Sequence, residues 1–165
     1  MVRHKKAQNL VLTTIFVVFI FFLVLTLFFD DLFTNPRMES QRYEHLEREA
    51  DRAARTLASD GYPQDWDEDN VLRAGVLTKG VFNYTKAKLL HDNIAYADLK
   101  EKLGITHQYY LNITHGVEEI IIQEPGSITK DSIIDQARYL ATRTRTVTST
   151  DGTATITIHV YRGIP

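Results

Sequence analysis

The feature that most constrains this chain is an apolar run near its N-terminus. From Asn9 to Phe29 the sequence NLVLTTIFVVFIFFLVLTLFF contains no charged residue. As an α-helix rising roughly 1.5 Å per residue, such a run reaches about 30 Å, the thickness of a bilayer's hydrocarbon core. In that medium a single segment can satisfy its own backbone hydrogen bonds only as a helix. The run therefore predicts a transmembrane helix over residues 9–29.

The charges on either side of the run predict its orientation. Lys5 and Lys6 precede it, and Asp30 and Asp31 follow it. A positive flank is preferentially retained in the cytoplasm. The expectation is a single-pass protein of the cell membrane, with a cytoplasmic N-terminus and an extracellular C-terminal domain. A cleaved secretory signal is the competing interpretation, but such signals have shorter apolar stretches and end in small residues, whereas this run ends in two aspartates.

The segment Glu39–Ser59 is rich in helix formers and has one apolar stripe. Charged residues fill its other faces, so the pattern predicts an amphipathic helix that lays the stripe on a sheet or another helix. A coiled-coil dimer is the alternative, although the heptad pattern is short for one. The residues of the stripe recur at spacings of three and four: Tyr43, Leu46, Ala50, Ala53 and Leu57.

The rest of the chain reads as short helices followed by paired strands. Residues 85–91 and 95–103 have helical composition, and the second segment ends at Gly104. Asp151-Gly152 is a strong hairpin turn signal, and His115-Gly116 resembles one. The runs expected to form strands on either side of these turns are residues 107–114, 117–123, 136–148 and 153–161.

These patterns predict an α+β fold in which a long N-terminal transmembrane and amphipathic helix packs on a small antiparallel β-sheet. The length of 165 residues suits one compact domain beside the apolar run. The expected order is a cytoplasmic basic segment, a transmembrane helix, an amphipathic helix and an extracytoplasmic α+β domain, over residues 1–8, 9–29, 30–60 and 61–165.

Composition argues against several classes of function. The chain has no cysteine, so no disulfide can hold its folded part together. The net charge of -2 and the lack of a basic stripe argue against a nucleic-acid partner. No nucleophile, phosphate-loop or zinc motif is present, so neither an enzyme nor a cofactor is predicted. The histidines, at positions 4, 45, 91, 107, 115 and 159, show no metal-ligand spacing, and no metal site is predicted from them.

One acidic loop is a weak calcium candidate. Asp65, Asp67 and Asp69 place carboxylates at every second position, as calcium-binding loops do. The loop has Asn70 where that pattern requires glycine and Val76 where it requires glutamate. A helix cap with additional carboxylates near the helix dipole explains the same residues.

Two sequons are candidate glycosylation sites in the expected outer domain. Asn83 and Asn112 each stand two positions before a threonine. The alternative for Asn83 is a helix cap, and for Asn112 a place at the end of a strand.

A basic N-terminus, an apolar helix, an amphipathic continuation and a small antiparallel sheet together resemble the archaeal type IV pilin-like surface proteins. The stretch 3–8 (RHKKAQ) is similar to their class III signal peptides, in which a peptidase would cut between Ala7 and Gln8. The run 61–66 (GYPQDW) and the downstream segments 75–77 and 85–89 also resemble this group. The chain departs from it at Leu12, where many pilins carry a glutamate five residues into the mature protein.

The resemblance implies a membrane-anchored structural subunit or minor pseudopilin of a surface filament, adhesion or secretion apparatus. The partners it implies are the lipid bilayer and other pilin-like subunits or membrane proteins. A second interpretation is a single-pass accessory or receptor-like module whose outer domain binds a ligand or partner protein without polymerising. A membrane-tethered enzyme is a third, with no motif to support it.

Overall fold

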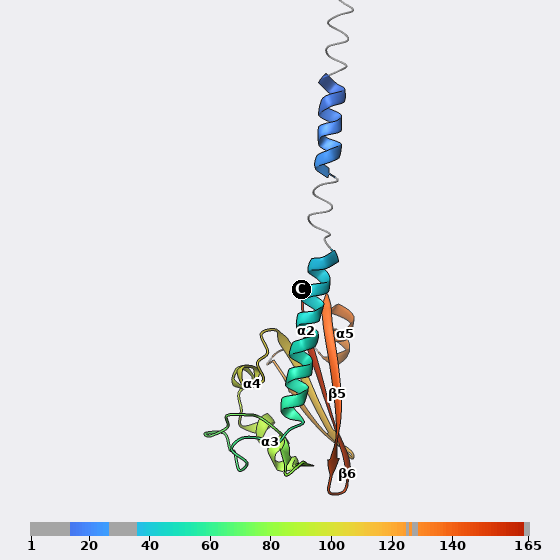
Figure 1. Ribbon diagram of the computed structural model, residues 1–165. Coiled ribbons are helices and arrows are strands. Elements are labelled where there is room, and N and C mark those ends of the chain that lie inside the picture. Colours follow the sequence, from blue (N-terminus) through green and yellow to red (C-terminus); the bar gives the residue numbers. More distant parts are fainter. Residues whose placement is uncertain (1–13, 27–35, 125, 127–128, 164–165) are drawn as a thin grey trace, which may run out of the picture. The chain divides into compact units, whose positions relative to one another are not determined.

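The computed structural model describes residues 14–26, 36–124, 126 and 129–163 (Figure 1). The chain divides into two compact units, Met1–Ser40 and Gln41–Pro165. In the first unit residues 14–26 form an α-helix. The second unit contains most of the helix α2, which spans Pro36–Leu57, and all the elements after it.

The predicted transmembrane helix is wrong. Among the described residues, no helix combines the length and the apolar character that crossing a bilayer requires. The described helical residues 14–26 reach about 20 Å, against about 30 Å for a hydrocarbon core. The helix α2 is longer, but charged residues cover much of its surface. The membrane-spanning part of the predicted fold class is corrected accordingly, as is the single-pass location with a cytoplasmic N-terminus and an extracellular domain.

The fold is α+β with antiparallel sheets. Its main sheet contains β3 (Gln108–His115), β4 (Glu118–Gln123), β5 (Tyr139–Ser149) and β6 (Gly152–Arg162), in the order β4-β3-β6-β5. Hairpins β3-β4 and β5-β6 form as the turn signals predicted. The turn between β3 and β4 holds Gly116 at φ 62°, a conformation that glycine adopts readily. The two hairpins join through β3 and β6, where Leu111 faces Ile158.

The helix α2 covers one face of this sheet (Figure 1). Side chains alternate between the faces of a strand, so Leu111 and Ile113 point the same way as Ile156 and Ile158 of the neighbouring strand. The predicted stripe of α2 meets them, except for Tyr43, which is exposed. The α2 residues buried in this core are Leu46, Ala50, Ala53, Ala54 and Leu57.

The opposite face of the sheet carries a smaller apolar cluster. Tyr110 and Tyr161 are buried there with Ile133 of α5 (Lys130–Gln136). The sequence pattern does not predict α5, because a short helix with one fully buried residue has little detectable periodicity. The helix therefore depends on its contact with the sheet more than on its own sequence pattern.

The remaining elements lie between α2 and the sheet in sequence. A small hairpin of β1 (Leu77–Thr78) and β2 (Val81–Phe82) precedes α3 (Tyr84–Asp92) and α4 (Tyr96–Lys102). The helices α3 and α4 confirm the predicted short helices.

The loop at residues 60–76, which precedes this hairpin, is held in place by Trp66. Its side chain is buried and donates the indole N–H to the Gly75 carbonyl at 3.0 Å. The Nζ of the buried Lys86 also donates to the Gln64 carbonyl, at 2.6 Å.

Candidate functional site

Two features of the described residues go beyond what folding requires. The first is helix 14–26, called the apolar helix below. Each side chain from Ile15 to Val24 is apolar and between 45% and 64% exposed. Successive helix positions turn by about 100°, so an unbroken apolar run covers every side of the helix. The apolar helix therefore has no polar face to turn toward water.

Exposure on this scale has an energetic consequence. Burying a Val, Leu, Ile or Phe side chain contributes about 1.5–3 kcal/mol relative to leaving it in water. Soluble monomers rarely expose contiguous apolar patches of more than a few hundred Å², and larger ones mark interaction sites. The apolar helix is therefore a candidate interaction surface.

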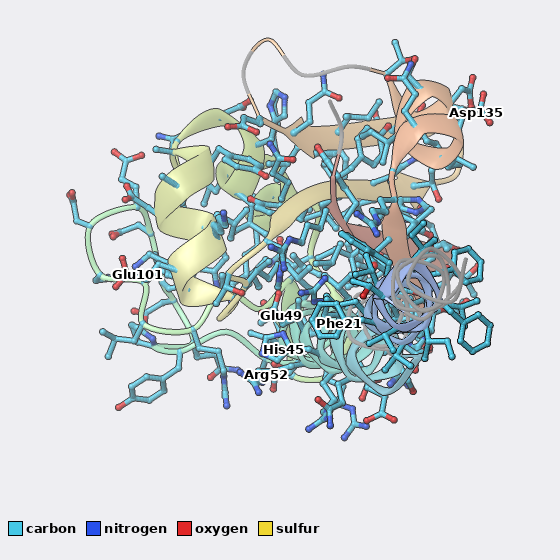
Figure 2. The ribbon with its side chains drawn as sticks, turned by 90° about the horizontal axis from the view of Figure 1, so that it is seen from above. Phe21, His45, Glu49, Arg52, Glu101 and Asp135 are labelled. Carbon is cyan, nitrogen blue, oxygen red and sulfur yellow. The ribbon has the colours of Figure 1, made fainter. Side chains whose placement is uncertain are left out.

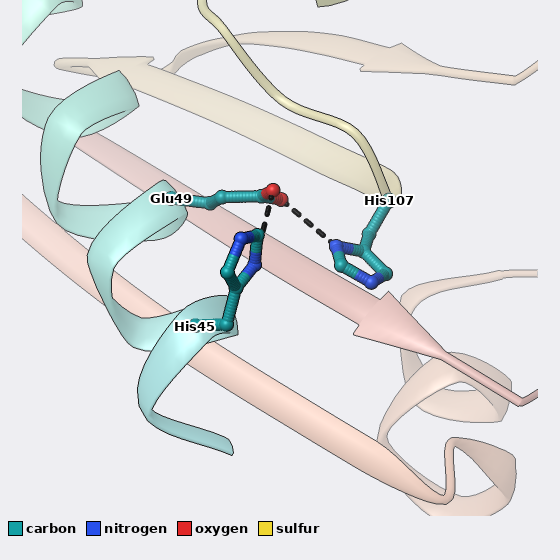
Figure 3. Close-up of side chains that lie close together, drawn as sticks. All are labelled: His45, Glu49 and His107. Carbon is teal, nitrogen blue, oxygen red and sulfur yellow. Dashed lines mark hydrogen bonds and ion pairs between the residues drawn. The ribbon is translucent and has the colours of Figure 1, made fainter. Parts of the chain in front are cut away.

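The second feature is a group of three side chains, His45, Glu49 and His107, called the His45 cluster below. His45 and Glu49 stand one turn apart on α2 and so share a face of that helix. Figure 2, which looks along α2, shows them on the same side of the helix, together with Arg52. His107 stands immediately before β3 and points back toward Glu49 (Figure 3).

Glu49 is the centre of the cluster. Its Oε1 lies 3.3 Å from His45 Nδ1, and its Oε2 lies 3.0 Å from His107 Nδ1. Thr106 adds two hydrogen bonds, donating its hydroxyl to Oε1 at 2.6 Å and its backbone N–H to Oε2 at 3.3 Å. The Glu49 side chain is 4% exposed, against 22% for His107 and 58% for His45. The cluster is thus buried at the carboxylate and open at His45.

The hydrogen bonds keep the Glu49 carboxyl ionised. Burial alone would raise its pKa, because it disfavours the charged form. Hydrogen bonds from Thr106 and His107 and the charge of His107 outweigh that effect, and the pKa of Glu49 is lowered. A carboxylate therefore faces two imidazole rings at neutral pH.

The spacing of the histidines does not reveal this cluster, for two reasons. The pair on α2 is a histidine and a glutamate at i and i+4, not two histidines. The third member, His107, is 58 residues from Glu49 and arrives through the fold. A search for His-x-x-x-Glu on the expected helix would have found the first half of the cluster and no more.

The predicted calcium candidates lie in an exposed turn. Asp67 Oδ1 accepts the backbone N–H groups of Asp69 and Asn70, each at 3.1 Å, and Asn70 Oδ1 accepts the N–H of Asp67 at 2.9 Å. Among the described residues, Asp65, Asp67 and Asp69 do not converge as a group able to hold one ion. The carboxylate of Asp67 serves to close the turn, and calcium binding stays a prediction.

The two sequon asparagines have structural contacts. Asn83 caps α3, accepting the Lys86 N–H at 3.2 Å and donating to Thr78 Oγ1 at 3.1 Å. Asn112 lies within β3, not at a strand end, and its amide donates to Glu119 on the neighbouring strand. Glycosylation at either residue stays a prediction.

The remaining predicted site residues lie outside the described part of the chain. They are Ala7 and Gln8 of the expected cleavage site, and the flanking residues Lys5, Lys6, Asp30 and Asp31.

Comparison with protein-family models, curated proteins and solved structures finds no match to this chain.

Proposed function

We propose that this chain is a structural assembly subunit, in which the apolar helix packs against the same helix of other copies while the α+β unit keeps its own core. The exposure of consecutive apolar side chains from Ile15 to Val24 is the observation that carries the proposal. This division of the chain into an apolar helix for association and a separate folded unit resembles the organisation of pilin-like proteins.

The all-round apolar surface favours several copies over a single partner surface. A flat partner covers one side of a helix and leaves the opposite side in water. Helices that are apolar on every side become stable when neighbours surround them. The apolar helix carries no charge, so like copies can approach without repulsion.

The α+β unit does not need such a partner for its own stability. Its core is covered within the unit, where Ile156 and Ile158 of the sheet and Leu57 of α2 are each inaccessible to solvent. Loss of association should therefore leave this unit folded, which makes the two parts of the proposal separable by experiment.

The experiment compares the purified full chain with the double variant Phe19→Ser/Phe22→Ser by analytical ultracentrifugation over a range of concentrations. The original chain is expected to form multimers and the variant to sediment as a monomer. The matched control is Leu72→Ser/Val117→Ser, which removes two exposed apolar side chains from the α+β unit. This control should form multimers like the original chain.

A multimeric Phe19→Ser/Phe22→Ser variant would overturn the proposal, as would an original chain that stays monomeric at every concentration. A chain that disperses as single copies in lipid vesicles and never self-associates would contradict it too. The sole tryptophan, Trp66, reports in each case whether the α+β unit is folded.

A further inference from the structure

We propose that the His45 cluster binds one divalent transition-metal ion of the zinc class, and that Thr106 orients the Glu49 carboxylate toward it. This site lies within the α+β unit and is independent of association through the apolar helix.

The distances suit such an ion. Donor atoms placed tetrahedrally around zinc, at about 2.0–2.1 Å from the metal, lie about 3.3 Å from one another. In the cluster one potential ligand atom from each residue lies within 4.8 Å of the other two. His45 Nδ1 lies 3.3 Å from Glu49 Oε1, and His107 Nδ1 lies 3.0 Å from Oε2, the other oxygen of the same carboxylate. Coordination of one ion requires the three ligand atoms to move closer together, and His45, which is 58% exposed, has the most room to rotate.

The donor types select the class of metal. Two imidazole nitrogens and one carboxylate oxygen suit zinc, copper, nickel and iron, whereas calcium and magnesium prefer shells made of oxygen. Three protein ligands leave at least one coordination position for water. The exposure of His45 places that position at the open side of the cluster. The site is therefore of the open, three-ligand type.

The surroundings favour a bound cation. The Glu49 side chain is nearly inaccessible to solvent, so solvent screens the attraction between its carboxylate and a cation only weakly. The hydroxyl of Thr106 donates to Oε1 from outside the cluster, as residues that orient a metal-bound carboxylate commonly do. The neighbouring Arg48 turns its guanidinium to Glu44, at 3.2 Å, and so offers its charge to a different carboxylate.

A metal ion here would join two parts of the fold. His45 and Glu49 belong to α2, and His107 leads into β3. An ion bound by all three links the helix to the start of the sheet across 58 residues of chain. Binding should therefore raise the melting temperature of the α+β unit, because an ion that binds the folded state alone stabilises that state.

The experiment uses the purified, metal-free full chain and Zn²⁺ as the probe, with Co²⁺ as a spectroscopic substitute. Calorimetric titration is expected to give one Zn²⁺ per chain, and Co²⁺ should produce visible absorption bands of a nitrogen- and oxygen-ligated ion. His45→Ala is the main variant, because the exposed His45 side chain is not needed for the core. We expect it to weaken Zn²⁺ binding by at least about tenfold and to abolish the Zn²⁺-dependent rise in melting temperature.

His91→Ala is the matched control. His91 is also an exposed histidine next to a carboxylate, 2.7 Å from Asp92, but it stands outside the cluster. This variant should bind Zn²⁺ like the original chain. A further variant, Thr106→Val, keeps all three ligands and should weaken binding by about 10-fold to 100-fold through loss of the orienting hydrogen bond.

Two results would overturn the proposal. One is an original chain that shows no saturable Zn²⁺ binding. The other is a His45→Ala variant that is folded by circular dichroism and binds Zn²⁺ as tightly as the original chain. In either case the cluster would be a hydrogen-bonded contact between α2 and the start of β3, and nothing more.

Discussion

The apolar helix and α2 are both helical, yet they relate to water in opposite ways. In α2 the apolar residues recur at spacings of three and four, and the sheet covers them. In the apolar helix they are continuous, and every one from Ile15 to Val24 is exposed. A stripe can be buried by one sheet inside one chain, whereas an all-round apolar surface needs several neighbours. The periodicity of apolar residues, more than their number, thus separates a helix that folds a unit from one that associates units.

This comparison can be tested through the free energy of unfolding of the α+β unit. Trp66 is the sole tryptophan, is buried in that unit and is a convenient fluorescence probe for urea unfolding of the full chain. Substitutions in the buried stripe of α2 should change this free energy strongly. Substitutions at partly exposed positions around α2 and on the apolar helix should change it progressively less.

The largest effect is expected for Leu57→Ala. Leu57 has no solvent exposure and packs in the main core, so its truncation removes apolar contacts and leaves a cavity. The unfolding free energy should fall by about 2–5 kcal/mol. A loss below about 1 kcal/mol would mean that α2 is held by something other than its buried stripe.

A smaller effect is expected for Arg143→Ala, which removes an ion pair at the rim of α2. The Nη2 of Arg143 on β5 donates to Glu47 Oε1 at 2.9 Å, and both side chains are about one-third exposed. Solvent screens such a pair, so its loss should lower the unfolding free energy by about 0.2–1 kcal/mol. Repeating the urea titration in 1 M salt, where the Debye length is about 3 Å, should shrink the difference.

Tyr43→Ala should have less effect still. Tyr43 continues the apolar spacing of α2 but is exposed, so its truncation leaves no cavity. The change should stay within about 0.5 kcal/mol. A cost comparable to that of Leu57→Ala would show that the stripe extends beyond the residues that the sheet covers.

The smallest effect on this unit is expected for Phe19→Ser in the apolar helix. Phe19 belongs to the other unit and is exposed, so the unfolding free energy reported by Trp66 should be unchanged within about 0.5 kcal/mol. The same variant should shift the association equilibrium toward monomer in ultracentrifugation. A destabilised α+β unit with unchanged association would reverse the comparison.

Local patterns predicted much of the α+β unit. The hairpin at Asp151-Gly152 follows from turn chemistry within a few residues, and α3 and α4 follow from composition and from the stop at Gly104, whose φ is +66°. In the predicted stripe of α2, Leu46, Ala50, Ala53 and Leu57 are buried as expected, whereas Tyr43 is exposed. Each of these signals lies in residues that are close together in the sequence. The same residues also form the structure that the signal predicts.

The membrane prediction failed for a different reason. It converted the uncharged run of residues 9–29 directly into a helix of matching length. Among the described residues, the backbone there forms helix 14–26, and neither it nor any later helix meets the length and apolarity needed for a bilayer. Composition measures how apolar a segment is, but it does not by itself establish a helix long enough to cross a bilayer.

The sequence alone determined which segments form amphipathic helices, which form strands with alternating apolar and polar residues, and where the tight turns lie. These properties depend on neighbours a few residues away. Tertiary structure alone decided that β3 pairs with β6, that α5 forms on the second face of the sheet, and that His107 meets His45 and Glu49. These contacts join residues far apart in the chain, and many pairings satisfy the same local patterns. Only the packing of the whole unit selects among them.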